Sequence, residues 1–167
     1  MRVVNGLAIV AAMGLAACDG SSRFGGPGGA GGPDGGIGSG SIDDPTSMAY
    51  FEEVVGDRVL FAVDQSTLGP QARTVLDAQA RWLVNNPGFT IIIEGHADER
   101  GTTEYNIALG ARRAASVQEY LFSQGIALTR MQTVSYGKER PIEICSDEIC
   151  YEQNRRGVTI LRAGAGV

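Results

Sequence analysis

The strongest constraint on the fold of this sequence is an alternation of strand-like and helix-like patterns between residues 58 and 163. Short runs of apolar and β-branched residues, bounded by turn residues, predict four strands: RVLFAV (58–63), FTIIIEG (89–95), MQTVSYG (131–137) and RRGVTILRA (155–163). The run FTIIIEG is apolar enough to predict a strand buried on both faces. Helical periodicity predicts helices at residues 69–86 and 103–123 and a shorter one near residue 150. This order of elements indicates an α/β (α+β) sandwich, in which helices pack on one sheet.

The N-terminus has the pattern of an export signal that ends at a lipidation site. Residues 1–17 contain Arg2, an apolar stretch of about a dozen residues and small residues before Cys18, and this stretch is shorter than the about 20 residues that span a bilayer. The segment LAAC resembles the lipobox of bacterial lipoproteins, which implies cleavage before Cys18 and acylation of that residue. Cys18 is therefore expected to be a membrane anchor; the alternative is an ordinary secretory signal followed by an incidental cysteine.

The next segment is too rich in glycine to fold. Residues 18–47 include GGPGGAGGPDGGIGSGS and few apolar side chains, so they cannot bury enough surface to offset the entropy lost on ordering. We expect residues 18–47 to be a disordered tether between the acylated cysteine and a folded domain at residues 48–167. A glycine-rich nucleotide-binding loop is excluded, because no strand precedes these glycines and no helix follows them.

The two remaining cysteines predict a disulfide, and the net charge excludes one class of partner. Cys145 and Cys150 enclose four residues, and in an exported protein this spacing favours a disulfide. The alternatives are two reduced buried thiols or, less well matched in spacing, a zinc pair. The net charge of −5 argues against a nucleic-acid partner, which requires a basic surface.

The segment EGHADERGTTEYN (94–106) follows a predicted buried strand and concentrates charge, as active sites often do. His96 is the chain's single histidine, which is too few for a catalytic zinc site, and no GxSxG-like motif accompanies it. We therefore expect no metal, no cofactor and no catalysis. One enzymatic alternative stays open, a cell-wall hydrolase that uses carboxylates of the Glu94–Glu99 loop. Glu99 and Arg100 are equally compatible with a solvated turn, and His96 with a structural role.

The helix predicted after this loop contains an arginine in an unusual position. At 100° per residue, Arg113 lies away from the polar stripe of its helix, in a partly apolar row, where an unpaired guanidinium is costly. We expect an internal carboxylate or a ligand anion to pair with it. Helical side chains lean toward the N-terminus, so Arg113 should reach the loop that contains Asp98, next to a helix start that Thr102 caps. Opposite charges in one slot would suit a zwitterion, with adjacent ammonium and carboxylate groups.

Three runs of the sequence resemble a known family: EGHADERGTTEYNIALGARRAASVQEYL and, further on, VSYGKERP and NRRGV. They are similar to the OmpA-like C-terminal domain family and, within it, to the peptidoglycan-associated lipoproteins. The resemblance covers about residues 57–162. It implies one mixed four-stranded sheet with helices packed on one face, and a non-catalytic domain that binds the diaminopimelate-containing stem peptide of peptidoglycan. By the same resemblance Asp98 and Arg113 clasp diaminopimelate, Arg155 is a lesser candidate, and four residues besides Gly101 line the pocket: Thr102, Tyr105, Asn106 and Leu109.

The resemblance also implies partners and a location. Members of the family pair with TolB and other Tol proteins and link the outer membrane to the cell wall during division. Asp19, directly after the expected acylation site, leaves open which membrane holds the anchor, because aspartate at this position retains some lipoproteins in the inner membrane. Ala62 stands where many relatives have an acid, although Asp64 is kept, and Thr103 replaces a frequent proline. A lipoprotein whose main partner is another protein is a further alternative.

Overall fold

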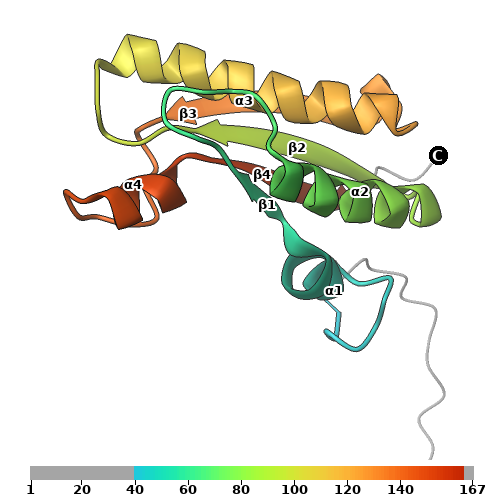
Figure 1. Cartoon of the computed structure of the whole chain (residues 1–167). Coiled ribbons are helices and arrows are strands. Elements are labelled where there is room, and N and C mark those ends of the chain that lie inside the picture. Colours follow the sequence, from blue (N-terminus) through green and yellow to red (C-terminus); the bar gives the residue numbers. More distant parts are fainter. Residues whose placement is uncertain (1–39, 164–167) are drawn as a thin grey trace, which may run out of the picture. The chain divides into compact units, whose positions relative to one another are not determined.

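The computed structural model describes residues 40–163 (Figure 1). The expected signal peptide (1–17), the expected acylation site Cys18, Asp19 and the tether up to residue 39 lie outside the described residues. No helix within residues 40–163 combines the length and the apolar character that crossing a bilayer requires.

The elements follow the alternation predicted from the sequence. The described part of the chain forms a short helix with a π-helical turn, two long helices, a 3-10 turn, a second short helix and four strands. In chain order these are α1 (Met48–Tyr50), η1 (Phe51–Gly56), β1 (Arg58–Leu60), α2 (Pro70–Asn85), β2 (Phe89–His96), α3 (Thr103–Ser123), η2 (Leu128–Arg130), β3 (Met131–Gly137), α4 (Glu148–Asn154) and β4 (Arg156–Ala163).

The four strands form one mixed sheet with the order β1-β4-β2-β3. Strand β4 pairs antiparallel with both β1 and β2, whereas β2 and β3 are parallel, so Ile91 lies opposite Leu161 on one side and Met131 on the other. The parallel pair requires a crossover connection, and α3 supplies it. The mixed four-stranded sheet expected from the resemblance is confirmed.

Helices α2 and α3 pack side by side on one face of this sheet (Figure 1) and cover its apolar residues. Tyr120 on α3 donates a hydrogen bond to Asp77 on α2 over 2.7 Å, which joins the two helices directly. The core includes one apolar group from the sheet and another from the helices: Val59, Phe89, Ile91, Ile93 and Leu161, and Ala72, Leu76, Ala80, Trp82, Leu83, Ala114, Val117 and Leu121.

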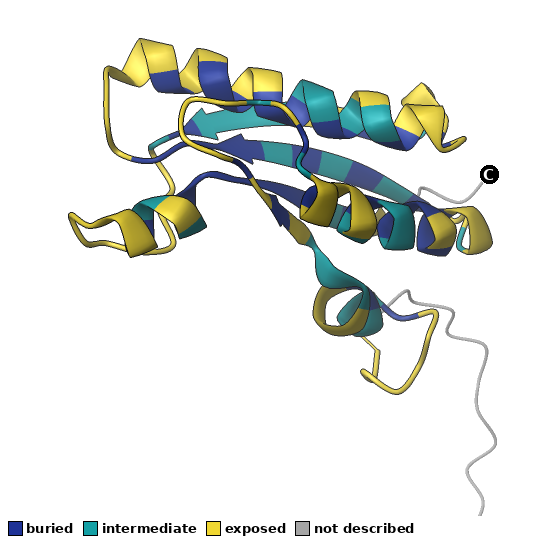
Figure 2. Ribbon diagram, in the orientation of Figure 1, coloured by how far each residue is buried: buried dark blue, intermediate teal, exposed yellow. Residues whose placement is uncertain are grey.

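The prediction that the strand at residues 89–95 is buried on both faces is wrong. Burial alternates along β2, with Phe89, Ile91 and Ile93 inside and Thr90 and Ile92 only partly covered. The reason is that both long helices lie on the same face, so the other face of the central strand has no layer over it (Figure 2).

Two boundaries differ from those expected. The domain makes contacts before residue 48: Trp82 Nε1 donates to the carbonyl of Pro45 over 2.8 Å, and Ser47 is buried and caps α1. Strand β1 ends at Leu60 rather than at residue 63. The Phe61 N–H still donates to the carbonyl of Arg155 over 2.8 Å, but the carbonyl of Ala62 accepts a hydrogen bond from α3 instead of from a neighbouring strand.

Helix α3 approaches β2 closely because two glycines face each other. A Cβ added to Gly95 would lie 1.8 Å from the carbonyl oxygen of Gly110, and one added to Gly110 would lie 2.7 Å from the carbonyl oxygen of Gly95. Neither backbone can move away without lifting the helix from the sheet.

We therefore predict that Gly95→Ala lowers the free energy of unfolding by about 3 kcal/mol or more, the upper end of overpacking costs. Gly88→Ala is the matched control, because a Cβ at Gly88 would meet nothing within 4 Å. Its effect should be within about 0.5 kcal/mol. Urea unfolding followed by circular dichroism measures both values, and equal stabilities of the two variants would contradict the proposed contact.

Candidate functional site

The site lies where β2 ends and α3 begins. Thr102 caps α3 as predicted, because its hydroxyl accepts a hydrogen bond from the Tyr105 N–H over 3.2 Å. Gly101 has a φ of +89°, a conformation that L side chains rarely adopt, and this allows the sharp turn before the helix. The buried amide of Asn106 donates to the carbonyl of Arg100 over 2.8 Å and fixes the loop against the first turn of α3.

Arg113 on α3 is fully buried and its partners are neutral. Nε donates to the carbonyl of Gln65 over 2.8 Å, Nη1 to that of His96 over 2.7 Å and Nη2 to that of Ala62 over 3.2 Å. No internal carboxylate pairs with Arg113, so that alternative is wrong: three carbonyl dipoles solvate the guanidinium. Pairing with a ligand anion, the other alternative, stays a prediction. A guanidinium has five N–H donors, so these three bonds leave two for another group.

The bonds of Arg113 also show what position 62 contributes to the fold. The residue that lacks the acid found in many relatives contributes its backbone oxygen to Arg113, and any side chain supplies that oxygen. Burial lowers the pKa of Arg113 to about 10, against the opposing effect of the nearby Asp98, so the group is cationic at neutral pH.

Asp98 is buried and carries two internal ion pairs. Arg100 Nη2 lies 2.6 Å and Arg155 Nη1 3.3 Å from the same carboxylate oxygen, Oδ2, while the backbone N–H of Arg100 donates to Oδ1 over 3.3 Å. Burial raises the pKa of Asp98, but the hydrogen bonds from Arg100 and Arg155 outweigh it and lower the pKa below its ordinary value. Asp98 is thus an anion, and its charge is already compensated by the protein.

A cavity of about 270 Å³ brings these groups together. Its walls come from the chain after β1, the loop after β2 and the first three turns of α3. The lining residues are Val63, Asp64, Asp98, Arg100, Gly101, Tyr105, Asn106, Leu109 and Arg113. Asp64, at a left-handed φ of 56°, accepts a hydrogen bond from the Tyr105 hydroxyl, which ties two walls together.

Six of the eight residues predicted to bind line this cavity, and Thr102 and Arg155 do not. Thr102 acts as the helix cap, and Arg155 lies behind Asp98, where it holds the carboxylate in place. Three lining residues were not among those predicted to bind: Val63, Asp64, which the sequence marked only as a retained acid, and Arg100. Nothing in the sequence marks Val63, but the spacing Asp-x-Arg in DER is a signal that could have found Arg100.

A larger cavity of about 810 Å³ lies between β1, α2 and the end of α4. Many of its lining side chains are apolar, among them Val59, Phe61, Leu68 and Val75. The smaller cavity is the candidate site, because Asp98 and Arg113 both line it.

His96 has the structural role that the sequence left open. The ring is 1% exposed, stacks obliquely on Tyr136 at 5.6 Å between centroids, and has Nε2 3.3 Å from a Glu94 oxygen. Burial, reinforced by the charges of Arg156 and Arg140, lowers the pKa of His96 to about 4. His96 is therefore neutral at physiological pH.

The geometry of the loop does not favour catalysis or metal binding. The Asp98 carboxylate is held ionised between two arginines, whereas a general acid needs a raised pKa. Glu94 contacts His96, and Glu99 is exposed to solvent. Among residues 40–163 no three His, Cys, Asp or Glu side chains come together as metal ligands.

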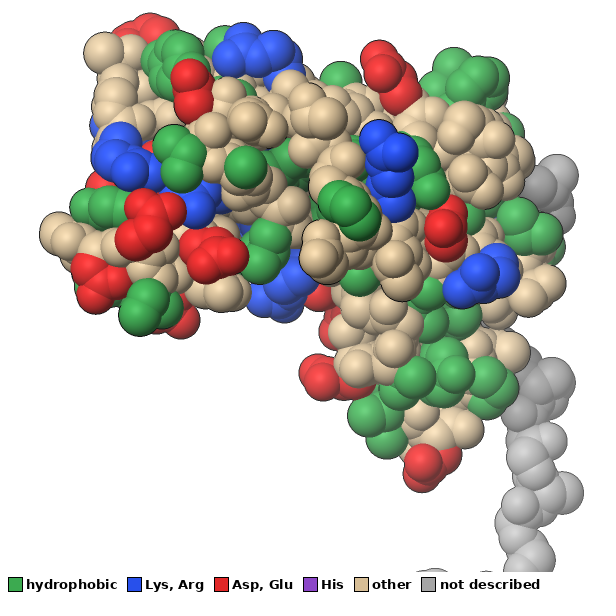
Figure 3. Space-filling model, in the orientation of Figure 1, with side chains coloured by type: hydrophobic (Ala, Val, Ile, Leu, Met, Phe, Trp, Pro, Cys, Tyr) green, Lys and Arg blue, Asp and Glu red, His purple; other side chains and the backbone are tan. Residues whose placement is uncertain are grey.

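Cys145 and Cys150 form a disulfide, the pairing favoured by their spacing, and it closes the segment that leads into α4. This helix, the start of α3 and the site lie at the same end of the sheet (Figure 1). Figure 3 shows acidic and basic side chains interleaved on this end of the molecule. The surface is mixed in charge, in keeping with internal ion pairs rather than with a basic patch.

The fold and the charged cavity define an OmpA-like domain, and residues 60–155 match the OmpA family. Proteins called peptidoglycan-associated lipoprotein are 52% identical over 131 residues in Rhizobium meliloti and 41% identical over 153 residues in Pseudomonas aeruginosa. These alignments cover 78% of this chain and 73% of the first relative, and 87% and 90% for the second. This chain therefore belongs to the family of peptidoglycan-associated lipoproteins.

Solved structures agree with this assignment. The crystal structure of the peptidoglycan-associated lipoprotein from Burkholderia pseudomallei is 36% identical, with a TM-score of 0.64 over 72% of this chain and 98% of that one. The C-terminal domain of Helicobacter pylori MotB has a TM-score of 0.60 over 65% of this chain and 86% of that one at 19% identity, which shows a shared fold alone.

The lowered pKa of His96 predicts a loss of stability in mild acid. The unfolded chain takes up a proton near pH 6.5 and the folded chain only near pH 4, so stability falls as the pH decreases between these values. Between pH 7 and pH 5 this single group should lower the free energy of unfolding by about 2 kcal/mol. Urea unfolding at both pH values measures the loss.

His96→Gln is the control for this prediction, because it removes the titrating ring and keeps the carboxylates. The variant should lose less stability between pH 7 and pH 5 than the parent. Asp98 does not interfere, because its lowered pKa places its own contribution below pH 4. Equal losses in parent and variant would show that His96 does not titrate differently in the folded chain.

Proposed function

We propose that the domain holds peptidoglycan non-covalently by binding the diaminopimelate residue of a stem peptide. The observation that carries the proposal is the presence of Asp98 and Arg113 in one cavity of about 270 Å³. The free end of diaminopimelate carries an ammonium and a carboxylate on the same carbon. Asp98 is the acceptor for the ammonium, and the two unused N–H groups of Arg113 are the donors for the carboxylate.

The remaining lining residues position this ligand. Gly101 leaves backbone close to the cavity at the start of α3, where free N–H groups favour an anion. Tyr105, Asn106 and Leu109 form the side of the cavity that belongs to the helix. Both charges of the site are present before the ligand arrives, so the ligand can be held by charge-assisted hydrogen bonds alone.

Acylation of Cys18 completes the proposed function. The relatives are called peptidoglycan-associated lipoproteins, and a lipid on Cys18 would anchor this chain in the outer membrane with its domain in the periplasm. The residues between Cys18 and the folded domain would then link the anchor to the wall-binding domain. TolB and the other Tol proteins are the proposed protein partners, with a role in envelope integrity and cell division.

Asp98→Asn should reduce binding to peptidoglycan about ten-fold or more, because it removes a charge-assisted hydrogen bond while the arginines beside it keep other partners. Arg113→Lys should have a similar effect. Alanine is less suitable at position 113, since it would leave three buried carbonyls unpaired. Arg112→Gln, at the exposed neighbouring position, is the matched control. Co-sedimentation with isolated sacculi measures binding, and circular dichroism checks the fold.

Retention of both site variants on sacculi at the level of the parent, with their folds intact, would refute the binding site. Loss of binding in Arg112→Gln as well would point to a general effect of charge on the surface.

Incubation of the purified chain with peptidoglycan tests the hydrolase alternative. If the chain only binds, no soluble fragments should be released, because the carboxylates of the loop are paired or solvated and are not placed for proton transfer. Release that disappears in Glu99→Gln would instead support an enzyme. Chromatography of the soluble fraction distinguishes the two results.

A further inference from the structure

Arg100 occupies the place at Asp98 that the proposed function gives to a ligand ammonium. Its Nη2 lies 2.6 Å from Asp98 Oδ2, a strong charge-assisted hydrogen bond. The side chain of Arg100 is 44% exposed, whereas that of Arg155, the other partner of Asp98, is 5% exposed. Arg100 is thus the cation of this pair that solvent reaches and that a ligand can displace.

Arg100 has a second set of partners on α4. Its Nη1 lies 3.5 Å from Glu148 Oε2, and its guanidinium lies 4.7 Å from the centre of the Tyr151 ring. Arg100 thus contacts Asp98, Glu148 and the Tyr151 ring at once, and a small rotation away from Asp98 would keep it beside the second carboxylate and the aromatic face. Neither position leaves the guanidinium without a partner.

Glu148 is 58% exposed and is positioned beside Arg100 by a second arginine. Its Oε1 lies 2.7 Å from Nη2 of Arg155, the arginine that also holds Asp98. Glu148 is the first residue of α4, a short helix whose N-terminus Asp147 caps through the Ile149 N–H over 2.8 Å.

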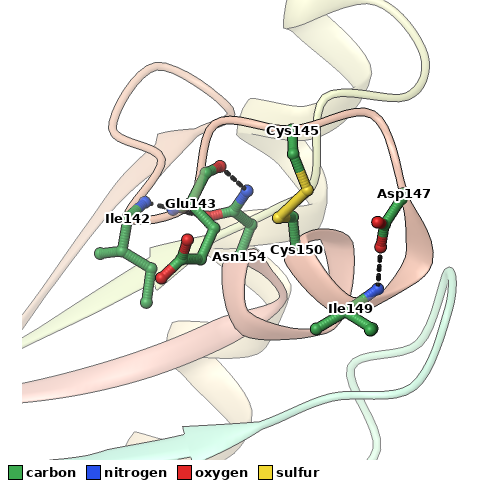
Figure 4. The surroundings of a disulfide bond; sticks show 7 residues. All are labelled: Ile142, Glu143, Cys145, Asp147, Ile149, Cys150 and Asn154. Atoms are coloured by element: carbon green, nitrogen blue, oxygen red, sulfur yellow. Dashed lines mark hydrogen bonds between the residues drawn. A yellow bond between two sulfur atoms is a disulfide. The ribbon is translucent and has the colours of Figure 1, made fainter.

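The segment before α4 is tied down at both ends (Figure 4). The disulfide between Cys145 and Cys150 joins it to the helix. The fully buried Asn154 accepts hydrogen bonds from the N–H groups of Ile142 and Glu143 and donates one to the Glu143 carbonyl. A seven-residue helix has little stability of its own, so these links are what fix the position of Glu148.

We infer that Arg100 serves as an internal stand-in for the ligand ammonium, and that Glu148 on the disulfide-bridged helix α4 receives Arg100 when the ligand takes its place at Asp98. This inference rests on the proposed binding of diaminopimelate and extends it to two positioning residues, Arg100 and Glu148. Binding exchanges one cation for another, so the buried Asp98 carboxylate keeps a partner throughout, which avoids the cost of an unpaired buried charge.

The exchange also sets the specificity of the site. A ligand without a cationic group cannot replace Arg100, because removing Arg100 alone would leave Asp98 with fewer partners. The site is thus built for ligands that carry an ammonium beside a carboxylate, and it discriminates against peptides whose corresponding amine is blocked.

The test measures the affinity for a soluble tripeptide that ends in diaminopimelate, by isothermal titration calorimetry with the full chain. Arg100→Gln removes the competing cation and should bind about three-fold or more tighter, since the ligand no longer breaks a charge-assisted bond. Glu148→Gln removes the carboxylate that pairs with the displaced Arg100, so this variant should bind the tripeptide about three-fold or more weaker, since a charge-assisted bond is lost in the complex. Glu152→Gln, on the exposed side of the same helix, is the matched control and should bind within about two-fold of the parent.

A double variant separates this role from a purely structural one. In Arg100→Gln/Glu148→Gln there is no arginine to receive, so the affinity should equal that of Arg100→Gln. If Glu148→Gln weakens binding equally in both backgrounds, Glu148 acts through Arg155 and the inference is overturned. It is also overturned if Arg100→Gln binds no tighter than the parent.

The disulfide provides an independent test. Cys145→Ser/Cys150→Ser should weaken binding in the same direction as Glu148→Gln, and the effect should vanish in the Arg100→Gln background. If this variant fails to fold, the comparison of Glu148→Gln with Glu152→Gln decides alone. If the parent chain does not bind the tripeptide in an Asp98-dependent way, the proposed function itself fails. Binding by the parent with no effect at Arg100 refutes only the exchange.

Discussion

The structure depends on one guanidinium. Arg113 extends from α3 and donates to three carbonyls, which belong to the end of β2 and to the segment after β1. These segments are not neighbours in the sequence, and the hydrogen bonds of a single side chain join them. The same three bonds orient the positive charge that Arg113 brings to the cavity, so one side chain serves both the fold and the candidate site.

Local patterns predicted most of the elements, because helix and strand periodicity extend over whole segments. Helix α3 and strand β3 have the predicted bounds, and the unusual position of Arg113 on its helix predicted its burial. The end of β1 and the one-sided burial of β2 could not be predicted in this way. Both depend on how distant elements pack: Ala62 turns toward α3, and the two long helices cover the same face of the sheet.

The predicted pair Asp98 and Arg113 lies in one cavity, but the partners of each group are different from those expected. Asp98 is paired with Arg155, 57 residues away, and Arg113 with carbonyls up to 51 residues away. No pattern along the chain encodes contacts over such separations. Residue types identified the chemistry of the site, and the tertiary structure alone identified how that chemistry is satisfied before a ligand binds.

The contact between Gly95 and Gly110 has a consequence for recognition as well as for packing. Gly95 precedes His96, whose carbonyl accepts from Arg113, and Gly110 lies one helical turn before Arg113. The backbone-to-backbone distance at this point thus sets how far the guanidinium extends past the sheet. Because neither glycine carries a Cβ, α3 can lie against β2 at this short distance. If the helix were lifted by the width of one atom, the Arg113 guanidinium would move away from its carbonyl partners and from Asp98.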